Sequence, residues 1–139
     1  MKGIAVTALL AVLLASPLLA QKAIDGAPQA RSVDGVIHVY WTSTDETGLL
    51  GYEVARGSGR ETASILFAVI FARVAPRGSN SPYDVIDETA FRTTDSFYQY
   101  RIVALYADGH RSDPYYVGVA HSSVSSVRRT WGSIKAMFR

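Results

Sequence analysis

The clearest pattern in the chain is an alternation of aromatic and β-branched residues with other residues over positions 97–106. With a period of two, one face of a strand there would carry Tyr98, Tyr100, Ile102, Ala104 and Tyr106. Asp108-Gly109 follows at once, and this pair is typical of a tight hairpin turn. We therefore predict a strand over this stretch, with the rest of a β-sheet built against it.

Shorter alternating segments, separated by turn residues, predict the neighbouring strands. In residues 36–42, Ile37, Val39 and Trp41 are spaced to point inward, and Asp34-Gly35 provides a turn before them. Further strands are predicted at 30–33, 50–56, 83–87 and 115–120.

Residues 63–75 form the most apolar internal run of the chain. Periodicity alone does not exclude a helix, but the many β-branched and aromatic residues favour one or two buried strands. The run is too short and too closely flanked by Glu61, Arg73 and Arg77 to cross a membrane. Six or seven short strands without an internal helix predict an all-β, antiparallel β-sandwich. A length of 139 residues, 48% of them hydrophobic, suits one such domain.

The first 20 residues have the layout of a secretory signal peptide. A basic start, Met1-Lys2-Gly3, precedes the apolar run 4–15, and Ser16-Pro17 and small residues lead to a predicted cleavage site after Ala20. The alternative is an uncleaved membrane anchor, for which the run is short. Residues 21–29 are then expected to be an N-terminal extension.

The chain contains no cysteine, so disulfides contribute nothing to its stability. Export without disulfides is typical of a bacterial periplasmic, cell-surface or extracellular protein. Without Lys2, the chain has 13 Lys and Arg against 12 Asp and Glu, but residues 21–121 have 9 against 12. The basic excess is therefore confined to the last residues, and nucleic acid is not an expected partner.

The C-terminal residues 122–139 combine a serine-rich link with a basic amphipathic segment. Val127, Trp131, Ile134 and Phe138 recur at helical spacing and predict a short helix with one apolar stripe. The predicted contact residues of this tail are Arg128, Arg129, Trp131, Ile134, Lys135, Phe138 and Arg139. Such a segment suits an anionic membrane surface, a partner groove or sorting machinery. The alternative is a helix packed on its own sandwich.

Residues 30–121 resemble a fibronectin type III domain of the kind found in bacterial exported proteins. The resemblance is carried by Ile37-x-Val39-x-Trp41, Gly51-Tyr52-Glu53-Val54-Ala55-Arg56 and Tyr98-x-Tyr100-Arg101-Ile102-x-Ala104. It implies an immunoglobulin-like sandwich, in which Trp41 packs between the sheets and Tyr98 takes the place of the tyrosine-corner residue. The predicted structural core is Trp41, Tyr52, Tyr98, Tyr100 and Ile102. The Arg-Gly-Asp motif of some adhesive members does not occur in this sequence.

No motif in the chain predicts catalysis, a cofactor or a metal. His38, His110 and His121 lie far apart, without the spacing of a zinc site, and are expected to be exposed. Asp45-Glu46 and Asp87-Glu88 are adjacent carboxylates that we expect to be solvated. A Gly-x-Ser-x-Gly nucleophile elbow does not occur either.

The sequence thus predicts an exported, non-enzymatic interaction module of the cell envelope that binds a protein or glycan partner. The outward tyrosines among Tyr40, Tyr106, Tyr115 and Tyr116 are candidate contact residues, although cross-strand shielding of the sheet is an alternative role. Two other functions stay open. One is an enzyme or enzyme-accessory domain, which would require Asp45, Glu46 and His110 to cluster in a cleft. The other is a structural envelope protein that self-associates through edge strands.

Overall fold

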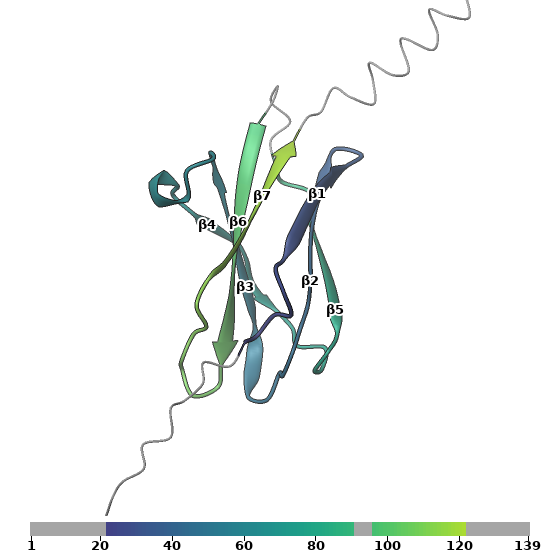
Figure 1. Ribbon diagram of the computed structural model, residues 1–139, viewed down its shortest axis with the longest axis vertical. Coiled ribbons are helices and arrows are strands. Elements are labelled where there is room, and N and C mark those ends of the chain that lie inside the picture. Colours follow the sequence, from purple (N-terminus) through teal and green to yellow (C-terminus); the bar gives the residue numbers. More distant parts are fainter. Residues whose placement is uncertain (1–21, 91–95, 122–139) are drawn as a thin grey trace, which may run out of the picture.

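The computed structural model describes residues 22–90 and 96–121, which form two antiparallel β-sheets (Figure 1). One sheet has the order β1-β2-β5, with β1 at Gln29–Val33, β2 at Val36–Thr42 and β5 at Pro82–Asp87. The other has the order β4-β3-β6-β7, with β3 at Leu49–Ser58, β4 at Ala68–Val74, β6 at Ser96–Tyr106 and β7 at Tyr115–His121. The predicted signal peptide, the serine-rich link and the tail lie outside the described residues.

The strand predicted first is the inner strand β6 of the larger sheet. It pairs with β3 on one side and β7 on the other, so both of its edges are hydrogen-bonded. The turn that follows is closed by a hydrogen bond of 3.0 Å from Gly109 N to Tyr106 O, and Gly109 has a φ of 90°. The two-residue turn between β1 and β2 holds Asp34 at φ 50° and Gly35 at φ 83°, which explains why this dipeptide occurs there.

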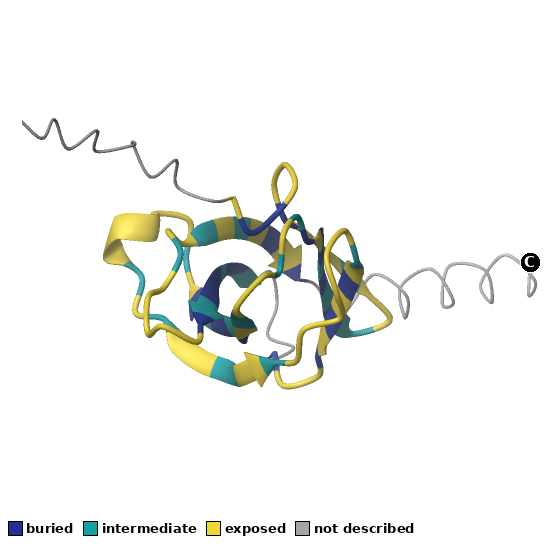
Figure 2. Cartoon of the chain, turned by 90° about the horizontal axis from the view of Figure 1, so that it is seen from below, coloured by how far each residue is buried: buried dark blue, intermediate teal, exposed yellow. Residues whose placement is uncertain are grey.

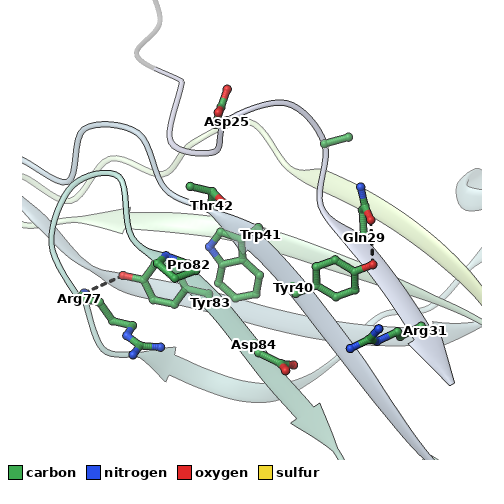
Figure 3. Close-up of a pocket in the computed structure, with 11 residues that line it drawn as sticks. Asp25, Gln29, Arg31, Tyr40, Trp41, Thr42, Arg77, Pro82, Tyr83 and Asp84 are labelled. Carbon is green, nitrogen blue, oxygen red and sulfur yellow. Dashed lines mark hydrogen bonds between the residues drawn. The ribbon is translucent and has the colours of Figure 1, made fainter. Parts of the chain in front are cut away.

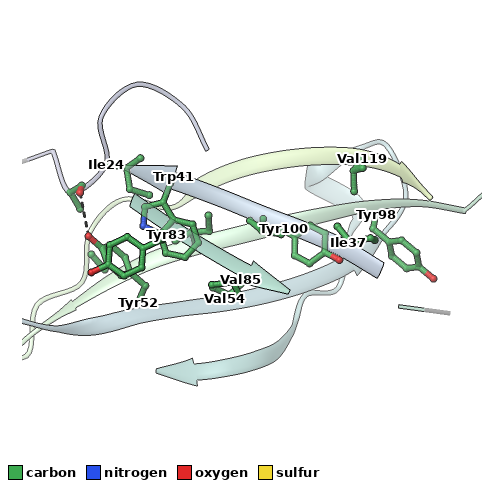
Figure 4. Close-up of a cluster of buried hydrophobic side chains, with 14 of the residues drawn as sticks. Ile24, Ile37, Trp41, Tyr52, Val54, Tyr83, Val85, Tyr98, Tyr100 and Val119 are labelled. Carbon is green, nitrogen blue, oxygen red and sulfur yellow. Dashed lines mark hydrogen bonds between the residues drawn. The ribbon is translucent and has the colours of Figure 1, made fainter. Parts of the chain in front are cut away.

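The inner faces of the two sheets share one hydrophobic core, and this makes the pair of sheets a sandwich (Figure 4). Trp41 of β2 stacks on Tyr83 of β5 with ring centroids 5.0 Å apart, and it forms a T-shaped pair with Tyr52 of β3 with centroids 5.2 Å apart. The residues predicted for the core are all buried: Trp41, Tyr52, Tyr98, Tyr100 and Ile102. The predicted all-β antiparallel fold is thereby confirmed. The partner of Tyr98 in a tyrosine corner would lie near residues 91–95, outside the described part, so that role stays a prediction.

The prediction of one or two buried strands over residues 63–75 is right about one strand and wrong about its burial. The run contains one 3₁₀ turn, Thr62–Ser64, and one strand, β4, which has no buried residue and appears only in yellow and teal in Figure 2. The reason is that β4 is an edge strand paired with β3 alone. Ahead of it, Leu66 is 93% exposed. Ile70, Phe71 and Val74 are half-buried and pack against the core, whereas Leu66 and Val69 are exposed, so the run contributes both to the margin of the core and to the surface.

The stretch predicted to be an N-terminal extension contributes to the core. Ala23 and Ile24 are buried, and Ile24 forms an isolated β-bridge with Ser43. The amide of Ala23 donates to the hydroxyl of Tyr115, 3.1 Å away. Two apolar residues between Lys22 and Asp25 are too few to show any periodicity, which is why the sequence pattern did not reveal them.

Within the described ranges, no helix has the length and apolar character needed to cross a membrane.

Candidate functional site

Two surfaces of the sandwich could bind a partner, one on the outer face of each sheet. We define the arginine–aromatic face as the outer surface of the larger sheet around Arg60, Phe67, Phe97, Arg101 and Tyr116. The second is a groove on the outer side of the smaller sheet.

The arginine–aromatic face exists because the connection between β3 and β4 folds back over the sheet. Gln99 of β6 donates from Nε2 to the carbonyl of Arg60 at 2.7 Å, and Thr62 Oγ1 donates to Gln99 Oε1 at 2.6 Å. A glycine at position 57 makes room for this connection, since a Cβ there would lie 2.0 Å from Ile65 Cγ2. The returning chain therefore reaches the outer face of the sheet and places its side chains there.

Arginines and aromatic rings interleave on this face. The Arg60 guanidinium lies 4.2 Å from the centroid of the Phe97 ring, and that of Arg101 lies 5.2 Å from the Phe67 ring. Phe67 in turn contacts Tyr116 of β7, with ring centroids 5.7 Å apart. These contacts join residues from the β3–β4 connection, β6 and β7 into one continuous surface.

Apolar side chains around this face are exposed to solvent. Leu66 is 93% exposed, Val69 49% and Tyr116 44%. Arginine and aromatic residues are the types enriched at protein interfaces, and a projecting leucine can fill a pocket on a partner. The arginine and aromatic residues of this face are therefore of the types enriched at protein interfaces.

Glu53 partly neutralises the positive charge of the arginine–aromatic face. Its Oε1 accepts from Arg111 Nη2 at 2.8 Å and lies 3.8 Å from Arg101 Nη2. One carboxylate thus serves two guanidinium groups, and Arg60 has no ion pair within the described ranges. The face keeps an excess of positive charge.

The groove on the smaller sheet has a volume of about 520 Å³ (Figure 3). Strand register explains how it is built, because Gln29 pairs with Tyr40 and Tyr40 pairs with Asp84 across the sheet. Cross-strand neighbours share a face, so these three side chains lie together. The lining residues are Asp25, Ala27, Gln29, Arg31, Tyr40, Trp41, Thr42, Arg77, Pro82, Tyr83 and Asp84.

The ring of Tyr40 is held from two directions. Its hydroxyl donates to Gln29 Oε1 at 2.8 Å, and the Arg31 guanidinium lies 5.5 Å from its ring centroid. Beside it, Asp84 Oδ1 lies 3.0 Å from Nδ1 of His38. The polar groups around Tyr40 therefore have fixed positions before any ligand arrives.

The other side of the groove is fixed by Tyr83. Its hydroxyl accepts from the amide of Arg77 at 2.7 Å and donates to a carboxylate oxygen of Glu46. Burial, together with the hydrogen bond to Glu46, raises the pKa of Tyr83 to about 12. The phenol is therefore neutral at physiological pH, and its hydroxyl holds the Arg77 main chain and the Glu46 carboxylate in place.

The prediction of an exposed His121 is wrong. This residue ends β7 and is buried, with Nδ1 2.7 Å from Oγ of Ser32 on β1. The contact links the two sheets where β1 and β7 run side by side. His38 and His110 instead lie near the surface and pair with Asp84 and Asp108.

The prediction of a solvated Asp87 is also wrong. Asp87 ends β5 and is 2% exposed, with Oδ2 2.6 Å from Arg56 Nη1 and 2.7 Å from the hydroxyl of Tyr100. Burial opposes its ionisation, but hydrogen bonds from Tyr100, Thr89 and Arg56 outweigh that effect and lower its pKa. Asp87 is also the last of the inward alternating positions of its strand, after Tyr83 and Val85. This spacing was the sequence signal that could have predicted its burial.

Asp45, Glu46 and His110 lie at the same end of the sandwich, where the amide of Ala107 donates to the carbonyl of Gly48 at 2.8 Å. Glu46 is occupied by structural bonds from Tyr83 and from the amide of Gly78 at 2.7 Å. The pocket that His110 lines contains neither Asp45 nor Glu46. This pocket therefore does not bring the three residues together.

Elsewhere among the described residues, no group of three or more His, Asp or Glu side chains is placed to hold a metal ion.

The tyrosines that were candidate contacts have different environments. Tyr116 is exposed, Tyr40 and Tyr115 are half-buried, and Tyr106 is 5% exposed beneath the ring of His110. The predicted tail contacts, residues 128–139, lie outside the described part of the chain. Sequence reasoning missed Arg60, Phe67, Arg31 and Arg77, because their proximity depends on strand register and on the path of a connection.

The strand edges bear on self-association. β1 and β7 lie against each other through Ser32 and His121, and β5 begins with Pro82 and carries Asp84. β4 pairs with β3 through two shifts of register, and such bulges discourage the addition of further strands. Edge-to-edge assembly is therefore not favoured by this fold.

No family model matches the chain, and no curated protein is similar to it. Among solved structures, an Fn3-like protein from Clostridium thermocellum is similar, with 15% sequence identity and a TM-score of 0.48. The match covers 71% of this chain and 94% of that protein's chain. The fibronectin type III-like fold predicted from the sequence thus has an Fn3-like structural neighbour, while the fold assignment itself rests on the two sheets and their register.

Proposed function

We propose that this chain is an exported, non-enzymatic interaction module of the cell envelope that binds a protein or glycan partner. The observation that carries the proposal is the arginine–aromatic face, where Arg60 and Arg101 interleave with aromatic rings next to the exposed Leu66. Because this face is positively charged and apolar, it suits a protein partner whose surface combines carboxylates with an apolar pocket.

The energetic core of such a contact would be Leu66 and its aromatic neighbours. A side chain that is 93% exposed loses contact with water when a partner covers it, and burial of a leucine stabilises a complex by about 2 kcal/mol. The arginines around it would choose the partner through charge.

The C-terminal segment would sort the module or hold it at its destination. Its basic residues and the aromatic pair Trp131 and Phe138 are the elements of a segment that binds an anionic membrane surface or sorting machinery. This role rests on the sequence pattern alone.

The experiment that tests the protein contact compares surface variants for binding to cell envelopes isolated from the host. We expect Leu66→Asp to lower the affinity at least about tenfold, because it places a charge in the contact. Ile86→Asp is the matched control, since Ile86 is 43% exposed on the outer face of the smaller sheet. Equal binding by the two variants would contradict the proposal.

A further inference from the structure

The groove on the smaller sheet has an even balance of charge, unlike the arginine–aromatic face. Arg31 and Arg77 contribute two positive charges to its lining, and Asp25 and Asp84 contribute two negative charges. A strongly anionic or cationic ligand would meet repulsion from one of these pairs. A ligand without charge would meet donors and acceptors of both kinds.

The groove offers side chains and not a strand edge. It crosses the outer surface of β1, β2 and β5, and the central strand β2 is already paired on both sides. A peptide that binds by strand addition needs unpaired backbone groups. The surface of this groove does not provide them at its centre.

We propose that this groove binds a neutral oligosaccharide. The C–H face of a sugar ring can pack on an aromatic side chain, here the half-buried ring of Tyr40, and sugar hydroxyls both donate and accept hydrogen bonds. The rings of Trp41 and Tyr83 lie in the core beneath the groove and support its floor. Asp84 would accept from hydroxyls and Arg77 would donate to them. The volume of about 520 Å³ lies within the range usual for small-ligand sites.

The geometry around Tyr40 favours recognition with little rearrangement. Its hydroxyl is already bonded to Gln29, and Arg31 lies over its ring. Because these side chains are ordered beforehand, binding would cost little conformational entropy. The inference goes beyond the proposed protein contact, which uses the opposite sheet, so that either can fail alone.

The test is an NMR titration of the isotope-labelled full chain with neutral hexasaccharides. The probes are cellohexaose, xylohexaose, mannohexaose and chitohexaose, with hexagalacturonate as the charged counterpart. We expect at least one neutral probe to shift the amides around Gln29, Tyr40 and Asp84. We also expect it to bind at least about tenfold more tightly than hexagalacturonate.

Variants then locate the site. Tyr40→Ala should weaken binding of the neutral probe at least about tenfold, and Tyr40→Phe should retain most of it because the ring persists. Tyr116→Ala, on the other sheet, is the control and should bind like the wild type. The proposal is overturned if no neutral probe shifts these amides, if hexagalacturonate binds as tightly, or if Tyr40→Ala and Tyr116→Ala behave alike.

Discussion

Asp87 shows at the scale of one residue how the sandwich accommodates a buried charge. Its carboxylate is almost inaccessible, and three neighbours share it: the guanidinium of Arg56, the hydroxyl of Tyr100 and the main chain and side chain of Thr89. Burial and the hydrogen bond to Asp87 together raise the pKa of Tyr100, so the phenol stays a donor. The charged group therefore joins β3, β5 and β6 at one end of the core.

Asp87 predicts a specific dependence of stability on pH. Because its pKa is lowered in the folded state, its contribution to the free energy of unfolding is fully present above the unfolded pKa of about 4. That contribution is lost as the pH falls through the folded pKa. Asp87→Asn should lower the stability at neutral pH by about 3 kcal/mol and flatten the acid limb of the profile.

The matched control lies on the same strand. Asp84 has a side chain that is 52% exposed, and Asp84→Asn should change stability by less than about 1 kcal/mol. The free energy of unfolding of both variants can be measured by denaturant unfolding at pH values from about 3 to about 7. If Asp87→Asn loses stability with falling pH in the same way as the wild type, then groups other than Asp87 cause the acid destabilisation, and the prediction is contradicted.

The connection between β3 and β4 is the element on which the arginine–aromatic face depends. Ile65 fits against Gly57 so closely that any side chain at position 57 would collide with it. This contact, with the bonds from Gln99 and Thr62, keeps the connection on the sheet. The face is therefore a product of one glycine and one returning segment.

Gly57→Ala should displace that connection. The added Cβ would lie 2.0 Å from Ile65 Cγ2 and 3.0 Å from the carbonyl oxygen of Leu66, and overpacking of this kind typically costs about 1–3 kcal/mol. Hydrogen exchange of residues 59–67 should become faster. In the double variant Gly57→Ala/Ile65→Ala the space is restored, so the two losses should not add. Additive losses would mean that the two side chains do not compete for one space.

For the whole molecule, the alternation of hydrophobic residues predicted the sandwich well because burial in a sheet follows a period of two. Ile37, Val39 and Trp41 point into the core as their spacing indicates. The run at 63–75 was misread because an apolar edge strand has the same composition as a buried one. The groove and the arginine–aromatic face were not predictable, since Tyr40 meets Asp84, and Phe67 meets Tyr116, only through strand register and the path of a connection.

The tail contributes a separate prediction at this scale. If the tail holds the protein at the envelope as proposed, replacement of both aromatic residues, Trp131→Ala/Phe138→Ala, should lower the share of the protein found in the envelope fraction without changing its thermal unfolding. Ser133→Ala is a control in the same segment, and it should leave the location unchanged. Fractionation of the host cells measures the location of both variants. An unchanged location of the double variant would contradict a role of the tail in attachment.

The most direct test of the central claim is site-specific photo-crosslinking in the native host. A photoreactive amino acid would replace Leu66 on the arginine–aromatic face, and in a second variant it would replace Ile86 on the opposite sheet. We predict a discrete crosslinked protein from position 66 that is absent from position 86. The same adducts from both positions, or none from position 66, would contradict the claim that this face makes the contact.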